Sequence, residues 1–321
     1  MAKVREVTII IPNYNGIELL KNCIKTLEEQ TCPDFKVLVV DNGSTDGSAE
    51  VRSEVLDLEV VALTGNTGFC GAVNIGIQHT GTPYVILLNN DTEADPEFVS
   101  ELLAGIKKSD RLFSCGAMML DYRNRELIDN AGDYYTALGW AVARGRGKRK
   151  SDFQREKYVF SCCGGASIYR RDLIAEIGAF DEGHFAYLED VDIGYRARIF
   201  GYQNRYIPSA RVYHIGSATT GTRYNEKKVF LAARNSVYLL YKNMPALQLL
   251  LNLPLIVVGT LLKAVFFAVK GLGREYIRGV VTGISNSKNC RRVPFRWGKL
   301  GSYMQIQVEL WVNILRILCS V

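Results

Sequence analysis

The stretch Val7-Thr8-Ile9-Ile10-Ile11-Pro12-Asn13-Tyr14-Asn15-Gly16 decides the fold, because a run of aliphatic residues ends abruptly in a polar loop. Two later stretches repeat this pattern: residues 37–47, with the sequence VLVVDNGSTDG, and residues 84–92, with the sequence YVILLNNDT. Continuous aliphatic runs of this length are typical of strands that are buried on both faces of a parallel sheet. A weaker run at 59–63 completes a set of four expected strands.

Segments with helical spacing of apolar residues separate these strands, at 17–29, 69–78 and 96–107. We expect Asp95 and Pro96 to be the N-cap and the first-turn proline of the last helix. The alternation of strands and helices predicts an α/β fold with a mostly parallel sheet covered on both faces. In such a sheet the ligand lies beyond the carboxyl ends of the strands.

Three polar loops follow those expected carboxyl ends, at residues 12–16, 41–47 and 89–92. Each loop taken alone is explained equally well by turn formation, since Asn, Asp and Gly are common turn residues. Three such loops, each directly after a buried strand, would meet at one edge of the sheet. The sequence therefore predicts a binding site there.

Composition narrows the class of protein. The chain has 321 residues, 48% of them apolar and 22% charged, with a formal net charge of +6, which is typical of a folded protein and not of a disordered one. Its eight cysteines include no CxxC pair, so we expect reduced thiols in a cytosolic compartment rather than a disulfide framework or a zinc ribbon. Residues 1–6 lead directly into a strand, so we expect no secretory signal peptide.

Neither common glycine-rich phosphate loop is present in the sequence: GxxxxGK[ST] does not occur, and no GxGxxG follows the first strand. Acidic loops at the strand ends instead suggest that Mg²⁺ or Mn²⁺ would hold the phosphates of a bound nucleotide. A basic segment at 144–157 has two interpretations, a solvated loop or a flap that contacts phosphate.

A second set of candidate residues lies later in the chain. Glu189, Asp190 and Asp192 form an acidic cluster, which suits either a general base with a raised pKa or the N-terminus of a helix. His214 follows an expected strand at 206–213 and is either a packed residue or a metal ligand. Gly164 and Gly165 would let the backbone approach a ligand closely, or would simply form a turn.

An ordered set of motifs over residues 5–245 resembles the family 2 glycosyltransferases, and within them the bacterial rhamnosyltransferase branch. The motifs are VTIIIPNYN at 7–15, VVDNGSTDG at 39–47, NTGF at 66–69, LNND at 88–91, CGGA at 163–166, GAFD at 178–181, EDVD at 189–192 and HIGS at 214–217. Arg234-Asn235 also matches the pattern, without a role that we can assign from sequence. The resemblance implies inverting enzymes of GT-A fold, with a Rossmann-like, mostly parallel sheet and a nucleotide-sugar donor.

The resemblance also implies roles for individual residues. It makes Asp190 the catalytic base and makes Asp91 and His214 the ligands of Mg²⁺ or Mn²⁺. Asn89 stands where relatives have the first acid of an Asp-x-Asp motif, so Asp91 alone would supply the carboxylate. The donor-binding residues that it implies are Pro12, Tyr14, Asp41, Asn66, Gly68, Asn90, Asp91, Gly164 and Gly165. Among these, Pro12, Tyr14 and Asp41 would line the pocket of the base.

The chain after residue 245 has a different character, and we expect the glycosyltransferase domain to span 1–245 and a helical region to span 246–321. Residues 242–321 hold eleven Lys and Arg against two Glu. Residues 249–269 are apolar and 303–319 have amphipathic helical spacing. These features favour an anionic lipid surface over nucleic acid, with helices that close the core or an oligomer interface as the alternative.

Taken together, these expectations describe an inverting, metal-dependent glycosyltransferase at the cytoplasmic face of a bacterial membrane, held there peripherally or monotopically. The resemblance implies transfer of rhamnose from dTDP-rhamnose to a polyprenyl-diphosphate-linked glycan in the synthesis of cell-wall or surface polysaccharide. The alternatives are transfer of another hexose or of galactofuranose, including from a UDP-linked donor, a nucleotidyltransferase of similar fold, and a non-catalytic scaffold.

Overall fold

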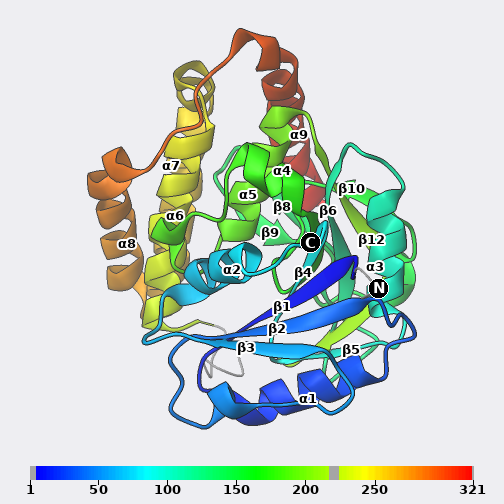
Figure 1. Ribbon diagram of the computed structural model, residues 1–321. Helices are drawn as coiled ribbons and strands as arrows, with labels where there is room; N and C mark the ends of the chain where they lie inside the picture. The colour runs from blue at the N-terminus through cyan, green and yellow to red at the C-terminus, as the bar shows by residue number, and fades with distance from the viewer. Residues whose placement is uncertain (1–4, 217–223, 320–321) are drawn as a thin grey trace.

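The computed structural model describes residues 5–216 and 224–319, which form a twisted mixed sheet with helices on both faces (Figure 1). Four parallel strands make up one half of the sheet, in the spatial order β4-β1-β2-β3. They are β1 (Val7–Asn13), β2 (Phe35–Asp41), β3 (Leu58–Ala62) and β4 (Tyr84–Leu88). All four were predicted, because each is a short aliphatic run bounded by turn residues.

The other half of the sheet is mixed, so the expectation of a mostly parallel sheet is only half correct. Here β11 (Ala166–Arg170) lies antiparallel between β4 and β6 (Leu112–Asp121), and β12 (Gln203–His214) runs parallel to β6. Because β11 begins at the edge where β4 ends, it brings the preceding glycines to that edge. Three short strands pair antiparallel around this half: β5 (Thr92–Ala94), β7 (Ile128–Asn130) and β10 (Lys157–Val159).

The two faces of the sheet carry different helices, and β1 shows why. Ile9 and Ile11 are buried against one face with α1 (Ile17–Glu28) and α3 (Phe98–Lys107), whereas Ile10 is buried on the other. That second face is covered by α2 (Gly68–Gln78), α4 (Arg171–Ile177) and α5 (Glu189–Phe200). Figure 1 shows α1 and α2 on opposite sides of β1–β3. Side chains alternate between faces along a strand, so one aliphatic run supplies both cores.

The start of α3 differs from the prediction. Its N-cap is Glu97, and the amide of Phe98 donates to the carbonyl of Asp95, so Asp95-Pro96 forms a turn before the helix. The backbone carbonyl of Pro96 accepts from Thr31, which ties that turn to the end of α1. The helix therefore begins two residues later than predicted, with Glu97 instead of Asp95 as its N-cap.

Four helices complete the chain: α6 (Glu226–Asn243), α7 (Ala246–Val269), α8 (Gly273–Asn286) and α9 (Leu300–Leu318). A separate two-stranded ribbon, β8 (Asp133–Tyr135) and β9 (Ala141–Ala143), lies beneath them. Short 3-10 turns lie at Ser48–Glu50, Lys150–Phe153, Glu182–His184, Ser287–Asn289 and Trp297–Lys299.

The predicted boundary near residue 245 runs through a shared core. Leu310 of α9 is fully buried beside Tyr135 and Tyr195, and its carbonyl accepts from the amide of Ala137. Asn313, which the amphipathic pattern placed on the polar face of the last helix, is also fully buried because its side-chain amide donates to the carbonyl of Tyr135. The helix α9 therefore closes the core, as the alternative for the tail anticipated.

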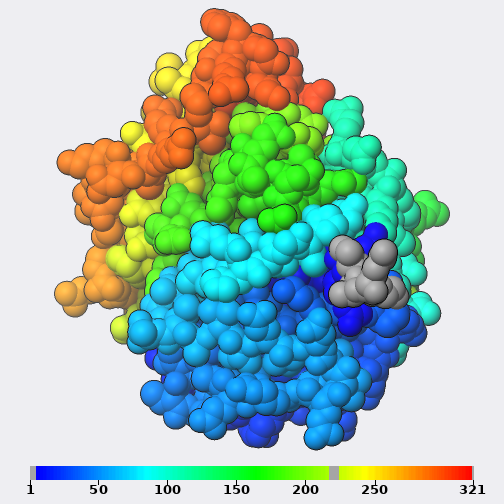
Figure 2. Space-filling view, viewed as in Figure 1, coloured from blue at the N-terminus to red at the C-terminus, as the bar shows by residue number. Residues whose placement is uncertain are grey.

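The helix α7 behaves differently from α9. It is the single helix, among the residues described, that is long and apolar enough to cross a membrane, with a mean hydropathy of 2.1 over its most apolar window. Only 11% of that window is buried inside the protein. Figure 2 shows the yellow and orange C-terminal segment at the upper left, projecting beyond the blue and cyan N-terminal part.

Candidate active site

A chain of buried hydrogen bonds joins the carboxyl ends of β1, β2 and β4. Asp41, which is 1% exposed, accepts from the side-chain amide of Asn13 (3.1 Å) and from the amide of Ser44 (2.9 Å). Asn13 in turn accepts from the side-chain amide of Asn90 (2.6 Å). The register explains this arrangement, because Asn13 and Asp41 are paired partners at the ends of adjacent strands. All three predicted loops therefore meet at one edge of the sheet.

The remaining donor-binding candidates surround the same edge. Tyr14 is 40% exposed and Pro12 is half-buried beside it. Asn66 is exposed, and its side-chain oxygen accepts from the amide of Gly68 at the start of α2 (2.8 Å). Gly68 has a φ of +80°, and a Cβ there would lie 2.5 Å from the carbonyl oxygen of Phe185, so this position requires glycine.

Two backbone contacts extend the chain from β4 to α5. The amide of Asn89 donates to the carbonyl of Gly165 (2.9 Å), and the amide of Gly164 donates to Oδ2 of Asp190 (3.1 Å). A Cβ at Gly165 would lie 2.9 Å from the side-chain nitrogen of Asn89, whereas one at Gly164 would make only ordinary contacts with Phe69 and Asp190. Position 165 thus favours glycine because any larger residue would clash with the side chain of Asn89. Asp41 and Asp190, 149 residues apart in the chain, belong to one connected network.

Asp91 and His214 are brought together by the pairing of β5 with β12. Oδ1 of Asp91 lies 3.3 Å from Nε2 of His214, and Nδ1 of His214 lies 2.8 Å from a carboxylate oxygen of Asp129. Burial lowers the pKa of His214, but hydrogen bonds to Asp129 and Asp91 outweigh it and raise the pKa to about 9. A metal ion bound between Asp91 and His214 would therefore take the place of the proton on Nε2 of His214.

This pair fits a divalent ion that arrives with its nucleotide. The described residues contain no group of three metal-ligating side chains, so the protein would supply one carboxylate and one imidazole. Mg²⁺ is commonly held in this way, by one or two carboxylates together with substrate phosphates and water. The contact between Asp129 and Nδ1 also matches the usual arrangement in which a carboxylate orients a metal-binding histidine.

Two cations lie near Asp91: Arg146, which belongs to the basic segment 144–157 noted in the sequence, and Lys228, which was not singled out from sequence. Arg146 forms an ion pair with Asp129 (3.1 Å) and is half exposed. Burial and the charge of Arg146 lower the pKa of Lys228, at the start of α6, while Asp91 opposes the change. Of the basic segment 144–157, then, Arg146 reaches the site, whereas Arg144 is buried and donates to the carbonyl of Ala131.

The acidic cluster divides into two parts with different environments. Burial opposes the ionisation of Asp192, but Arg196 and Lys242 hold its pKa well below the ordinary range through contacts of 2.9 and 3.0 Å. By contrast, burial raises the pKa of Asp190, which is only partly relieved by hydrogen bonds from the amides of Gly164 and Val191. Asp192 is therefore held as an anion by two cations, whereas burial disfavours the ionised form of Asp190.

Two neighbouring carboxyls share the electrostatic environment of Asp190. Burial and then the charge of Asp190 raise the pKa of Glu189 to about 8, and its Oε2 has no hydrogen-bond partner in the part of the chain that the structure describes. The same two causes raise the pKa of Asp133 to about 8. At neutral pH the three groups thus carry fewer than three negative charges, and Asp133 was missed because no local signal links it to α5.

The loop that leads into Asp190 is strained and is held by α6. Phe185, Tyr187 and Leu188 have φ values of 63°, 73° and 66°, in the left-handed region that side chains disfavour. The side-chain amide of Asn235 donates to the carbonyls of His184, Ala186 and Tyr187, at 2.8–3.0 Å. Arg234 donates to the carbonyls of Gly183 and His184. The Arg234-Asn235 pair thus shapes the approach to α5, a role that only the folded structure reveals.

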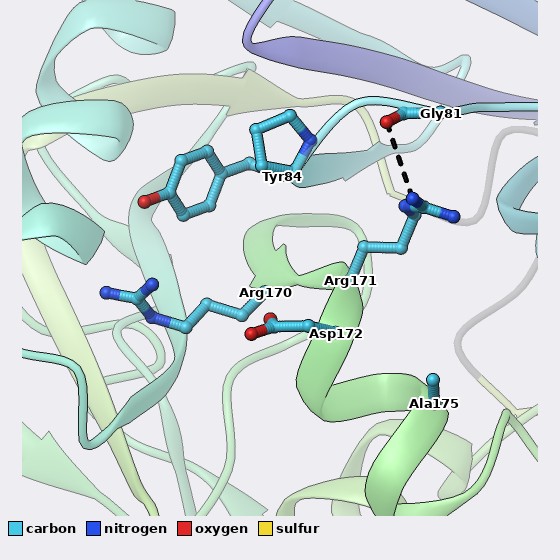
Figure 3. A pocket seen from close by; sticks show the side chains of 7 residues that line it. Gly81, Tyr84, Arg170, Arg171, Asp172 and Ala175 are labelled. Carbon is cyan, nitrogen blue, oxygen red and sulfur yellow. Dashed lines mark hydrogen bonds between the residues drawn. The ribbon is translucent and has the colours of Figure 1, made fainter.

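A cavity of about 400 Å³ lies elsewhere, at the amino end of β4 (Figure 3). Its arginines are occupied: Arg171 donates to the carbonyls of Thr82 and Gly81, and Arg170 pairs with Asp110. Because it lies at the opposite end of the strands, it is not part of the site described above.

Comparison with known proteins identifies the family. Residues 8–178, more than half of the chain, match the family described as Glycosyl transferase family 2. The chain is 26% identical over 262 residues to the N-acetylglucosaminyl-diphospho-decaprenol L-rhamnosyltransferase of Mycobacterium tuberculosis, with coverage of 71% of this chain and 84% of that protein.

Solved structures share the fold. The mannosyltransferase PcManGT from Pyrobaculum calidifontis, in complex with GDP-Man and Mn²⁺, aligns with a TM-score of 0.55 at 16% identity over 89% of this chain and 88% of its own. GalNAc-T7 with UDP, GalNAc and Mn²⁺ aligns with a TM-score of 0.56 at 17% identity over 73% of this chain and 48% of its own. The fold is thus a GT-A-like mixed α/β fold, and the chain is a glycosyltransferase that belongs to glycosyl transferase family 2.

Proposed function

We propose that this enzyme transfers a sugar from a nucleotide-sugar, with inversion and with the help of a divalent cation, to a lipid-linked glycan acceptor. The sugar is rhamnose from dTDP-rhamnose, and the product enters cell-wall or surface polysaccharide. The observation that carries the proposal is a path of hydrogen bonds and peptide links that joins Asp41 to Asp190. It runs through Asn13, through Asn90 and its neighbour Asn89, and through Gly165 and its neighbour Gly164. A donor bound along this edge would have its base at one end and its anomeric carbon near the other.

The donor half of the proposal rests on the loops after β1, β2 and β3. Tyr14 offers an exposed ring against which a nucleobase can lie, next to Pro12. Oδ2 of Asp41 accepts one hydrogen bond, from Ser44, and so retains a lone pair for the N3–H of thymine or uracil. Asn66 and Gly68 border the same space from the start of α2.

The diphosphate would lie near Asp91, His214 and the cations Arg146 and Lys228. Asp91 and His214 would hold Mg²⁺ or Mn²⁺, which supplies Lewis-acid stabilisation of the departing nucleoside diphosphate. Support for a metal comes from the His214–Asp129 contact and from the Mn²⁺ that accompanies two structural neighbours. Asn90 and the main chain at Asn89 fix the position of Asp91 between β4 and β5.

Asp190 is proposed as the general base. In an inverting transfer one carboxylate takes the proton of the acceptor hydroxyl as that oxygen attacks the anomeric carbon, and the bond from that carbon to the diphosphate breaks. A raised pKa makes Asp190 a better proton acceptor than an exposed aspartate, while protonation of Glu189 or Asp133 limits the repulsion around it. The amide of Gly164 directs Oδ2 of Asp190 toward the edge shared with β4.

The lipid-linked acceptor is suggested by the mycobacterial relative, whose name specifies a decaprenol diphosphate carrier, and by the exposed apolar surface of α7. The midpoint of α7 is held on the protein, because the indole of Trp140 donates to the carbonyl of Gly259 (3.1 Å) and a Cβ at Gly259 would lie 2.4 Å from the carbonyl oxygen of Leu138. This contact favours a helix that lies in the cytoplasmic leaflet rather than one that crosses the bilayer.

The test is an assay of nucleoside diphosphate release with a panel of dTDP-, UDP- and GDP-sugars, with and without a chelator. Polyprenyl-diphosphate-linked N-acetylglucosamine in detergent micelles serves as the acceptor. We expect turnover with dTDP-rhamnose that is lost on chelation and restored by Mg²⁺ or Mn²⁺. Turnover with a UDP-hexose or UDP-galactofuranose alone would replace the sugar assignment. Full turnover in the presence of chelator would contradict the metal assignment.

A further inference from the structure

An apolar groove separates the catalytic part of the protein from the exposed helices. It has a volume of about 300 Å³ and lies between α6, α7, α8 and the turn that joins β8 to β9. Its walls include Leu138 and Trp140 of that turn, Val237 of α6 and Val257 of α7. The volume is about twice that of the engineered ~150 Å³ cavity that holds one benzene molecule, so two five-carbon units would fit.

Lys263 is the one charged residue among those that line this mainly apolar groove, whose other polar side chains are Ser236, Thr260 and Tyr276. The ammonium of Lys263, on α7, lies 5.6 Å from the centroid of the Trp140 ring, and no carboxylate of the described residues is within ion-pair distance of it. The two acids that follow residue 242 are engaged elsewhere: Glu275 pairs with Arg278 and Glu309 pairs with Arg198. An unpaired cation held among apolar side chains is costly unless an anion approaches it.

The groove opens on one side to the apolar surface of α7. Leu253, Val257 and Leu261 all line the groove, yet they are 46%, 48% and 61% exposed. A hydrocarbon chain in a lipid leaflet against α7 would therefore meet a continuous apolar path into the groove. Exposed apolar side chains in such number are typical of an interaction surface.

The turn that lines the groove also connects it to β8, which lies close to the helix that carries the proposed base. Leu138 is five residues beyond Asp133, the first residue of β8, and five extended residues span at most about 17 Å. Asp133 accepts a hydrogen bond from Ser161 (3.2 Å), and Ser161 packs against Gly194 of α5, the helix that carries Asp190, since a Cβ at Gly194 would lie 2.6 Å from Cβ of Ser161. The turn thus links the groove to the catalytic edge over a distance that a short glycan and its diphosphate would cover.

We propose that this groove binds the phosphate-bearing end of the lipid carrier, with Lys263 paired to a carrier phosphate and the first isoprene units packed between α6, α7 and Trp140. The inference rests on the proposed function, and it assigns the acceptor a binding site that is separate from the donor loops. It also explains why a cation occurs in the most apolar helix of the chain. The same cation would otherwise be expected at the end of the helix rather than inside the groove.

The test measures binding of decaprenyl diphosphate in detergent micelles to the full-length protein, without any sugar donor. Lys263→Met removes the charge but keeps the length of the side chain, and Val257→Trp fills the groove. The matched controls are Lys270→Met and Val258→Trp, at positions on or next to α7 that do not line the groove, and Val258 has the same 48% exposure as Val257.

We expect both groove variants to weaken binding by at least about tenfold, the loss that corresponds to one charge-assisted contact, and we expect Lys263→Arg to retain it. The controls should bind within about twofold of the wild type. Equal losses for Lys263→Met and Lys270→Met would overturn the proposal, since they would indicate general attraction of an anion.

A second measurement separates the carrier from ordinary phospholipid. Partitioning of each variant onto phosphatidylglycerol vesicles should be unchanged by Lys263→Met. If that substitution weakens vesicle partitioning and leaves decaprenyl diphosphate binding intact, the lysine serves the membrane surface and the groove assignment is wrong. If binding behaves as expected while no polyprenyl-linked acceptor supports sugar transfer, the groove stands and the proposed function fails.

Discussion

The side chain of Asn235 holds the loop that leads into Asp190. It is fully buried in α6, and its amide donates to the carbonyls of His184, Ala186 and Tyr187. Substitution by Ala removes these three hydrogen bonds and also the one that the side-chain oxygen of Asn235 accepts from Nε of Arg234 (3.0 Å). The carbonyl of His184 keeps a donor in Arg234, so the carbonyls of Ala186 and Tyr187 lose their partner.

The free-energy cost of the substitution has two sources. Two carbonyls lose their hydrogen bonds, and those bonds no longer offset the strain of the loop backbone. An unsatisfied buried acceptor costs about 1–3 kcal/mol, and the lower part of that range applies because both residues are half-buried and water can reach them. The loss is then about 2–3 kcal/mol. Three residues in the left-handed region, Phe185, Tyr187 and Leu188, store about 1–2 kcal/mol each, so the loop relaxes once it is released.

We therefore expect Asn235→Ala to lower kcat by about 30- to 100-fold, since 1.4 kcal/mol corresponds to a factor of ten, with a smaller change in the KM for the donor. The acid limb of the pH–rate profile should also move to lower pH. Burial raises the pKa of Asp190, and a relaxed loop admits water, which returns that pKa toward its ordinary value. Steady-state kinetics across pH 5–9 and a thermal melt are the measurements.

The matched control is Asn252→Ala in α7, which removes an equally buried amide that pairs with Gln307 at 2.8 Å, away from the catalytic edge. Both variants should melt at lower temperature, and only Asn235→Ala should lose kcat and shift the acid limb. If Asn235→Ala is destabilised as much as Asn252→Ala but keeps its kcat and its pH profile, the loop does not position Asp190 and the reasoning is refuted.

Four further outcomes are expected. Asp190→Asn should lower the rate of nucleoside diphosphate release by about 10²- to 10⁴-fold without changing the melting temperature by more than a few degrees. Asp91→Asn should raise the concentration of Mn²⁺ needed for half-maximal activity by about tenfold, as measured by metal titration. Leu250→Asp with Leu262→Asp, at positions 66% and 52% exposed, should reduce flotation with anionic vesicles while activity on a water-soluble acceptor persists. Glu189→Gln should stabilise the protein more at pH 8 than at pH 5, as measured by urea unfolding.

The sign of the last outcome follows from linkage. The pKa of Glu189 rises to about 8 on folding, so the folded state binds the proton more tightly than the unfolded state, and stability falls as pH rises from about 4.5 to 8. Gln cannot ionise and removes that loss. A pH dependence of unfolding that is the same in the variant and the wild type would show that Glu189 is not the group responsible.

The predictions for Asp190, for Asp91 and for the Leu250 and Leu262 pair would each be contradicted by a different result. Near wild-type release by Asp190→Asn would remove the assigned base. An unchanged metal requirement in Asp91→Asn would move the cation to other ligands. Undiminished flotation of the double Asp variant would show that α7 does not contact the lipid.

The elements that could be predicted are those whose signal is local. The strands β1, β2 and β4 are aliphatic runs that end in Asn, Asp or Pro, and the structure has them within one or two residues of the expected bounds. Because parallel strands end at the same edge, the meeting of Asn13, Asp41 and Asn90 follows from the pattern and from topology together. The resemblance to the family implied, in addition, that Asp190 belongs to the same site as Asp41 and Asp91.

What could not be predicted depends on pairings between distant segments. The antiparallel course of β11, the contact of Asp133 with the acidic cluster and the burial of Asn313 all join residues that no short window of sequence contains together. A buried polar residue such as Asn313 or Asn235 looks like a surface residue in a hydropathy pattern, because its hydrogen-bond partners are carbonyls of another loop.

The sequence by itself therefore determined the alternation of strands and helices, the polar edge that they create and the family to which the chain belongs. The tertiary structure decided which carboxyls of the acidic cluster have raised pKa values and which has a lowered one. It also decided how α6 holds the loop before Asp190, and which tail helix joins the core and which stays exposed. The physical reason is that hydrophobic periodicity is a local property, which a few consecutive residues are enough to establish. Electrostatics, buried hydrogen bonds and packing depend on neighbours that only folding brings together.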